Sequence, residues 1–351
     1  MMQTRRDFIL GAAGAVGAMA SGCVGLGKVA NQRLLTPRMM WAYLAQFGMK
    51  LWERRKHYTD LKLDESMWKS LTERAGEVGV NVFVFDLAEG MVFPSHPELA
   101  VKGSWEPERM KDEIPRLKGM GMIAVPKLNF STTHNGWLKH YRRMVSTPQY
   151  YRLCEDLLDD VSEIFGRPRY IHIGCDEEDT TWHLMHSNTR LYVLARRGEM
   201  WKYDFMHLVN KIESLGSRAW AWSDYGWDHA DFIEWCPKSV LLSNWYYDEG
   251  HGGFDVEKNP VAEDKKRLAQ YAQLEKAGYD QVPCGTNWVG WARKRKKVGA
   301  DDVIGSLVKH CRKAVSQKHL KGFMMASWRP CATADDFAFI SRGIDLLSAA
   351  L

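Results

Sequence analysis

The sequence predicts an α/β protein with a single (β/α)8 TIM barrel. Apolar runs of strand length recur eight times, and longer amphipathic segments separate them. Each strand and helix together take roughly 35–45 residues, which suits a barrel. An open doubly wound sheet would usually show a glycine-rich phosphate turn after the first strand, and the residues after Met39–Leu44 contain none.

Eight segments have the β-branched or continuously apolar character of strands that are covered on both faces. In chain order they are Met39–Leu44, Val80–Phe85, Met122–Leu128, Tyr170–Gly174, Arg218–Trp222, Val240–Trp245, Gln281–Thr286 and Gly322–Ser327.

The segments between the strands show helical spacing, and several end in glycine, which suits a helix C-terminus. Clear examples are Asp64–Val78, Gln149–Phe165, Met200–Leu215 and Asp301–Gln317, with glycines at Gly79, Gly166, Gly216 and Gly278.

The N-terminus predicts export. Arg5 and Arg6 open a twin-arginine pattern, and the small-residue apolar run Gly11–Ala20 is too short to span a bilayer. The run leads to Ala20-Ser21-Gly22-Cys23, which resembles a bacterial lipoprotein box with Cys23 as the lipidated residue. We therefore expect a signal over residues 1–23, a linker over 24–36 and the catalytic barrel over 37–351, anchored by lipid to a membrane in the periplasm or at the cell surface. A soluble periplasmic form, cleaved elsewhere, is the alternative.

Composition is that of an ordinary globular protein. The 351 residues are 45% hydrophobic and 26% charged, and the net charge of +5 is too small to indicate a nucleic-acid partner. Six cysteines besides Cys23 match no disulfide or metal-binding spacing, so we expect buried thiols. We expect no cofactor and no metal, and the oligomeric state stays open.

Carboxylates and aromatic rings gather where the predicted strands end, and these ends form the mouth of a barrel. Indole faces stack on sugar C–H groups, and carboxylates bind hydroxyls and transfer protons, so the pattern predicts a glycan substrate. The candidate residues are Asp86, Glu89, His134, Asp176, Glu177, Trp222, Asp224, Trp245, Tyr246, Asp248, Trp288 and Trp328.

Asp176 and Glu177 after the fourth strand are the strongest catalytic candidates. Two adjacent carboxylates repel each other, which raises the pKa of one and prepares it as a general acid. Gly174 and Cys175 leave room for the backbone to turn both side chains towards the mouth. The acidic run 176–179 would also suit the first turn of a helix.

The segment His172-Ile173-Gly174-Cys175-Asp176-Glu177 resembles the His-x-Gly-x-Asp-Glu signature of glycoside hydrolase family 20, the β-N-acetylhexosaminidases. Three further segments are similar to the family's in the same order: Trp222-Ser223-Asp224, Trp245-Tyr246-Tyr247-Asp248 and Trp328. The stretch from Pro126 to His134 is loosely similar to a third-strand segment that ends in histidine.

The resemblance implies substrate-assisted retaining cleavage of terminal 2-acetamido sugars. Glu177 would protonate the glycosidic oxygen and later activate water, while Asp176 would orient the acetamido group. Tyr246 would bind that group, and Asp248 would bind ring hydroxyls. The pocket wall would include Trp222, Trp245 and Trp328, and we also expect His134, Asp224 and Trp288 to contact the substrate.

Two departures put the terminal sugar in doubt. The family usually has an arginine at the end of the first strand, which is absent from Met40–Tyr43, and Arg329-Pro330 stands where an acidic residue normally follows the last-strand tryptophan.

Three alternatives therefore stay open. The first is a two-carboxylate glycosidase that pairs Glu177 with Asp86, Glu89, Asp224 or Asp248. Its substrate could be an anionic sugar, which the basic run 293–297 would bind. The second is a metal hydrolase using His172, Asp176, His183 and His186. The third is a sugar-binding lipoprotein without turnover.

Overall fold

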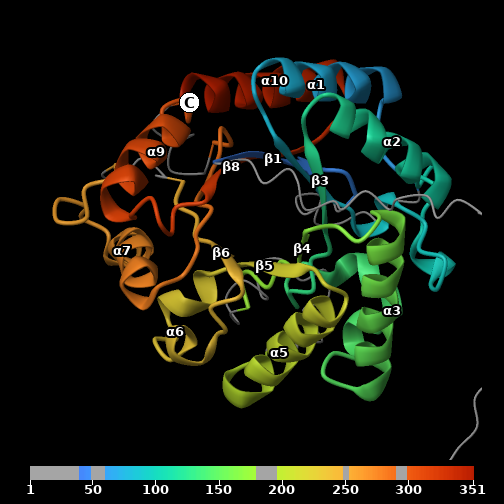
Figure 1. The fold of residues 1–351 in the computed structure, drawn as a ribbon, viewed down its shortest axis with the longest axis horizontal. Helices are drawn as coiled ribbons and strands as arrows, with labels where there is room; N and C mark the ends of the chain where they lie inside the picture. The colour runs from blue at the N-terminus through green and yellow to red at the C-terminus, as the bar shows by residue number, and fades with distance from the viewer. Residues whose placement is uncertain (1–38, 49–59, 179–195, 248–252, 290–298) are drawn as a thin grey trace, which may run out of the picture. The chain divides into compact units, whose positions relative to one another are not determined.

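The computed structural model of the protein describes residues 39–48, 60–178, 196–247, 253–289 and 299–351. These residues belong to one compact unit, which extends from Pro37 to Leu351. Figure 1 shows helices arranged around a central set of strands.

Eight parallel strands form one sheet in the order β6-β5-β4-β3-β2-β1-β8-β7. Parallel bridges from Leu242 to Gln281 and from Trp245 to Cys284 join β6 to β7 and close the sheet. The strands are β1 (Met40–Gln46), β2 (Val82–Asp86), β3 (Ile123–Lys127), β4 (Tyr170–His172), β5 (Arg218–Trp222), β6 (Leu241–Ser243), β7 (Cys284–Gly285) and β8 (Gly322–Pro330). The predicted (β/α)8 barrel is confirmed.

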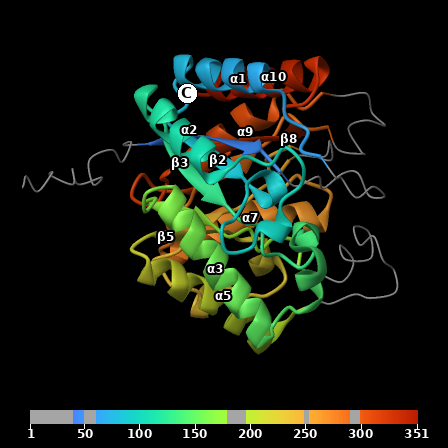
Figure 2. The same ribbon diagram turned by 90° about the vertical axis from the view of Figure 1, so that its right-hand side faces the viewer.

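The helices cover the outside of the strands, and α1 and α10 lie side by side in both views (Figures 1 and 2). The α-helices are α1 (Glu65–Glu77), α2 (Pro107–Gly119), α3 (Pro148–Ile164), α5 (Gly198–Ser214), α6 (Phe232–Trp235), α7 (Ala262–Ala277), α9 (Val303–Ala314) and α10 (Ala334–Ala349). Short 3-10 helices are η2 (Ala88–Gly90), η3 (Pro97–Leu99), η4 (Asn135–Arg143) and η5 (Asp224–Trp227).

Local sequence explains where helices begin and end. Asp64 caps α1 by accepting a hydrogen bond from the Met67 amide, and Thr147 and Thr333 cap α3 and α10 in the same way. Gly278 ends α7 in the left-handed conformation, with φ at 82°. The predicted helix ends therefore lie close to the observed ones.

The core has two layers because side chains alternate along each strand. Met40, Ala42 and Leu44 of β1 point into the barrel, whereas Trp41 and Tyr43 pack towards the helices. Six free cysteines, all among the described residues, are buried as expected: Cys154, Cys175, Cys236, Cys284, Cys311 and Cys331.

Five strands are shorter than predicted: β2 and β3 by one or two residues, and the fourth, sixth and seventh strands by two to four. The fourth strand ends at His172, because Gly174 takes a φ of 70° and leaves the extended conformation. The sixth and seventh strands reduce to Leu241–Ser243 and Cys284–Gly285, since the pairs beyond them are isolated bridges. Apolar runs alone could not show where the ladder breaks.

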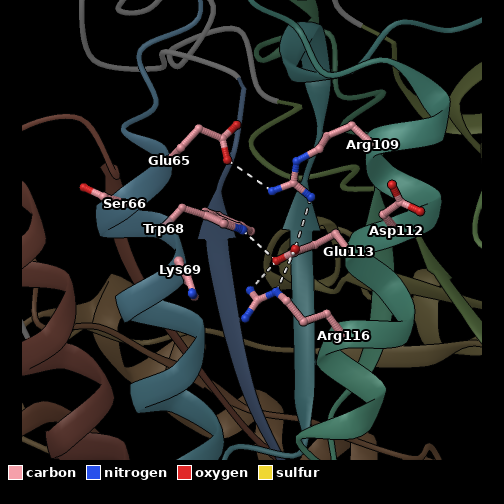
Figure 3. Close-up of a pocket in the computed structure, with 8 residues that line it drawn as sticks. All are labelled: Glu65, Ser66, Trp68, Lys69, Arg109, Asp112, Glu113 and Arg116. Carbon is pink, nitrogen blue, oxygen red and sulfur yellow. Dashed lines mark hydrogen bonds and ion pairs between the residues drawn. The ribbon is translucent and has the colours of Figure 1, made fainter.

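One surface groove lies between α1 and α2, with Glu113 at its centre (Figure 3). The buried Glu113 carboxylate accepts hydrogen bonds from the indole of Trp68 at 2.8 Å and from Arg116 at 2.9 Å, and it pairs with Arg109 at 3.2 Å. The cluster ties the two helices together outside the barrel.

Candidate active site

The residues that follow β4 turn sharply at the mouth of the barrel. Gly174, Cys175 and Glu177 have φ values of 70°, 66° and 55°, so two residues with side chains occupy the left-handed region. His172 supports the turn because its Nδ1 accepts a hydrogen bond from the Gly174 amide at 3.0 Å. The His-x-Gly part of the motif therefore shapes the backbone that carries Asp176 and Glu177.

Asn129, two residues beyond β3, holds Asp176. Its Nδ2 donates to Asp176 Oδ1 at 2.9 Å. A Cβ on residue 174 would lie 2.1 Å from the Asn129 Oδ1 atom, so only glycine leaves room for this amide.

His134 joins the two acidic residues. Its Nε2 lies 3.3 Å from Asp176 Oδ2 and 2.9 Å from Glu177 Oε2. The His134 side chain is 4% exposed, and those of Asp176 and Glu177 are 13% and 14% exposed. Burial opposes protonation of His134, but the charges and hydrogen bonds of the two carboxylates prevail and raise its pKa to about 10.

The imidazolium has the opposite effect on Asp176. Burial works against ionisation of this carboxyl, but the nearby His134 charge, with help from Lys127 and Asn129, keeps its pKa well below the usual range. Asp176 is therefore ionised at neutral pH.

Asp224, the first residue of η5, approaches from β5. Its Oδ2 accepts a hydrogen bond from the Glu177 amide at 2.8 Å. Burial and the negative charges of Asp176 and Glu177 raise the pKa of Asp224 to about 8.

Aromatic rings stand beside these carboxylates. Trp328 lies 6.1 Å from Trp222 between ring centroids, and its indole donates to the Tyr247 hydroxyl at 3.1 Å. Trp245 lies 5.0 Å from Tyr247 and 4.6 Å from Trp227. Trp222 is buried and packs behind the aromatic group. Partly exposed surface remains on Trp328, Tyr247 and Trp227.

The catalytic-domain model of glycosyl hydrolase family 20 matches residues 114–335, which is more than half of the chain. The chain belongs to glycosyl hydrolase family 20. A search among curated proteins finds no match.

Solved structures with the same fold include family 20 proteins. A β-N-acetylhexosaminidase from Bacteroides fragilis has 14% identity and a TM-score of 0.57 over 88% of this chain and 66% of its own. A β-N-acetylglucosaminidase from Vibrio harveyi, an inactive mutant, has 13% identity and a TM-score of 0.53 over 89% and 57%. Dispersin B has 16% identity and a TM-score of 0.57 over 90% and 98%. This chain thus spans less than two thirds of the length of the first two.

The family 20 signature residues come together as the sequence predicted in most cases. His134, Asp176, Glu177 and Asp224 form one connected cluster. The predicted wall residues Trp222, Trp245 and Trp328 lie in one aromatic group, and Trp288 is half-buried after β7, where its amide donates to Thr286 at 2.9 Å.

Tyr246 requires a correction. Its side chain packs in the layer towards the helices, where its hydroxyl lies 3.2 Å from Asp264 Oδ2 and accepts from Asn259 at 3.0 Å. The tyrosine at the mouth is Tyr247, since alternation from Trp245 places the second residue beyond it on the same face. Asp248 and Cys23 lie outside the described residues.

Several residues of the family 20 site were missed. Ser131 and Thr133 donate to the carbonyl oxygens of Asp176 and Glu177, each at 2.5 Å. Behind them, buried Arg196 pairs with Glu178 and Asp204 at 2.5 and 2.9 Å. Hydroxyl residues near His134 were a readable signal, but nothing in the sequence links Glu178 to Arg196.

One of the two departures from the family pattern, Arg329, has a visible structural role. Arg329 turns towards α10, where its guanidinium lies 4.1 Å from the centroid of Phe339 and 3.5 Å from Asp336. The basic run 293–297, His183 and His186 lie outside the described residues.

Among the described residues, His134, Asp176 and Glu177 place potential metal-ligand atoms within 4.8 Å of one another. A metal would have to displace a proton from an imidazole whose pKa is raised to about 10, which weakens binding at neutral pH. Of the predicted metal ligands, His172 already uses its Nδ1 to accept from Gly174.

Proposed function

We propose that this family 20 barrel hydrolyses terminal β-linked 2-acetamido sugars by a substrate-assisted mechanism. The observation that carries the proposal is the Asp176–Glu177 pair, which His134 bridges beside the aromatic wall. The names of the B. fragilis and V. harveyi structures describe enzymes of this substrate class.

In the first step, Glu177 gives a proton to the glycosidic oxygen as the bond from that oxygen to C1 breaks. The acetamido carbonyl oxygen forms a bond to C1, which produces an oxazolinium ring and releases the aglycone as an alcohol. Ionised Asp176 accepts the acetamido N–H and offsets the positive charge of the ring.

In the second step, ionised Glu177 takes a proton from water while the water oxygen attacks C1. The bond from C1 to the oxazolinium oxygen, which came from the acetamido carbonyl, breaks and restores the acetamido group. The two attacks on C1 from opposite faces retain the anomeric configuration, and Glu177 ends protonated for the next cycle.

Two of the candidate carboxylates are poorly placed for a two-carboxylate mechanism. Asp86 is fully buried and pairs with Lys127 at 2.6 Å inside the barrel, and Asp224 is bound to the Glu177 amide.

Tyr247, whose hydroxyl accepts a hydrogen bond from Trp328 Nε1, is the residue to which we assign the contact with the acetamido carbonyl oxygen.

The test is hydrolysis of chromogenic β-N-acetylglucosaminide and β-N-acetylgalactosaminide beside the matching β-glucoside. We expect cleavage of an acetamido sugar but not of the glucoside, and loss of that cleavage in Glu177→Gln. Cleavage of the glucoside at a similar rate would favour a two-carboxylate enzyme. Tight glycan binding without cleavage of any sugar in a wider panel would favour a binding protein.

We also propose export by the twin-arginine route with lipid attached at Cys23, on the basis of Arg5, Arg6 and the Ala20–Cys23 box. Within the described ranges, every helix is too short or too polar to span a bilayer. Replacing Arg5 and Arg6 with lysine should retain the protein in the cytoplasm, and Cys23→Ser should abolish labelling by a fatty acid. Unchanged export or labelling would refute the corresponding part.

A further inference from the structure

We propose that Asp224 is a positioning residue that fixes the backbone of Glu177 and does not bind the sugar. The proposal rests on the proposed function, because it concerns the residue that would act as acid and base. It replaces the substrate contact that the sequence predicted for Asp224.

Glu177 needs such support because it has a side chain and a φ of 55°. A residue of this kind in the left-handed region is strained and persists only where surrounding contacts hold it. Cys175, two residues earlier, adds a second strained position with a φ of 66°.

Both peptide groups of Glu177 are held from neighbouring strands. On one side, Asp224 Oδ2 accepts the Glu177 N–H at 2.8 Å, and on the other side, the Thr133 hydroxyl donates to the Glu177 carbonyl at 2.5 Å. Asp224 Oδ2 is the acceptor that holds the Glu177 amide.

Asp224 is itself rigidly placed. Ser223 donates through its hydroxyl to Gln270 of α7 at 3.0 Å, and Trp227 donates through its indole to the same oxygen at 3.0 Å. Both ends of η5 are thus attached to one helix, which fixes the first residue of the turn.

The burial of Asp224 argues against contact with a sugar. The residue is 8% exposed, and its Oδ1 atom is buried without a hydrogen-bond partner among the residues that the structure describes. A carboxylate that binds a hydroxyl must present an accessible oxygen. The raised pKa of about 8 agrees, because a proton on Oδ1 leaves Oδ2 free to accept the amide and adds no further negative charge beside ionised Asp176.

The test compares Asp224→Asn with Asp224→Ala. Asparagine keeps the shape and an oxygen that accepts the Glu177 amide, whereas alanine removes the acceptor. We expect Asn to keep kcat within about threefold of the parent and Ala to lower kcat roughly 100-fold, with KM within about threefold in both. The control is Asp228→Ala, which removes an exposed carboxylate paired with Lys266 and should change neither constant.

Two kinetic results would overturn the proposal. A rise in KM in both variants with an unchanged kcat would make Asp224 a sugar ligand. Equal losses of kcat in Asn and Ala would mean that the carboxyl group itself is needed in the reaction. If Asp224→Ala does not fold, Asp224→Leu, which fills the space without an acceptor, takes its place.

Crystal structures of the same variants separate this proposal from the proposed function. We expect Glu177 to keep its left-handed conformation in Asp224→Asn and to lose it in Asp224→Ala. An unchanged Glu177 in the alanine variant would refute the positioning role. If the parent protein cleaves no acetamido sugar, the proposed function fails, yet the comparison of Glu177 conformations still decides the role of Asp224.

Discussion

The side chain of Asn129 occupies the space that a Cβ on Gly174 would need. A Cβ on residue 174 would lie 2.1 Å from Asn129 Oδ1. From this position Asn129 Nδ2 donates a hydrogen bond to Asp176 Oδ1 at 2.9 Å. The glycine of the motif therefore helps to hold Asp176 indirectly, by leaving room for Asn129 just beyond the neighbouring strand β3.

Gly174→Ala should damage both stability and activity. The left-handed φ of 70° and the displaced Asn129 should together lower the free energy of unfolding by roughly 2–5 kcal/mol. Loss of the Asp176 contact should lower kcat at least about 100-fold. Urea unfolding and hydrolysis assays measure the two effects.

Gly305→Ala is the matched control. Gly305 is an exposed residue within α9, and a Cβ there meets nothing within 4 Å. The substitution should raise stability by about 0.5–1 kcal/mol and leave kcat unchanged. Similar effects from the two glycine substitutions would contradict the steric argument at Gly174.

His134→Asn should destabilise the protein in a pH-dependent manner. Because the pKa of His134 is raised to about 10, its contribution to stability is complete below its unfolded pKa of about 6.5 and disappears as the pH rises through 10. The difference in unfolding free energy between parent and variant should therefore shrink between pH 6.5 and 10, as measured by urea unfolding. A difference that stays constant over this range would refute a charged His134.

Tyr247→Phe should lower kcat/KM about 10- to 100-fold, because its hydroxyl lies with Trp328 at the mouth. Tyr246→Phe should leave the kinetics unchanged but cost about 1–2 kcal/mol of stability, since Asn259 loses its hydrogen-bond acceptor. Steady-state kinetics and urea unfolding of both variants check the assignment. The reverse pattern would return the acetamido contact to Tyr246.

Glu113→Ala should weaken the attachment of α1 to α2 without affecting the site. The buried indole N–H of Trp68 would lose its 2.8 Å acceptor, at a cost of about 1–3 kcal/mol (Figure 3). Thermal unfolding and kcat measure the outcome. Glu77→Ala, which removes the exposed partner of Arg74, is the control and should be nearly neutral. A loss of kcat in folded Glu113→Ala would contradict the separation of this cluster from the mouth.

The sequence was informative where periodicity or motif spacing determines structure. The strand Arg218–Trp222 matches in both bounds, since its large and small residues alternate and glycine ends the helix before it. The strand-end pattern also predicted that His134, Asp176 and Glu177 lie at one barrel mouth, but the sequence did not indicate that His134 bridges the two carboxylates.

The remaining features depend on backbone turns that periodicity does not encode. Tyr246 and Tyr247 are adjacent tyrosines, and the sequence does not show that the alternation from Trp245 continues past the end of β6 at Ser243, which places Tyr247 at the mouth. The role of Glu178 was hidden because its partner Arg196 follows 18 residues later, too far along the chain for helical or strand spacing to relate the two. In both cases the contact depends on tertiary structure and cannot be inferred from the local sequence.

The most direct test of substrate assistance is the hydrolysis rate of chromogenic β-glucosaminides that carry acetyl, fluoroacetyl or trifluoroacetyl groups. Fluorine makes the carbonyl oxygen a poorer nucleophile, so we expect kcat/KM to fall steeply along this series in the parent protein. Rates that do not depend on fluorination, with Glu177→Gln still inactive, would show that a protein carboxylate or a water molecule attacks C1 and would contradict the mechanism proposed here.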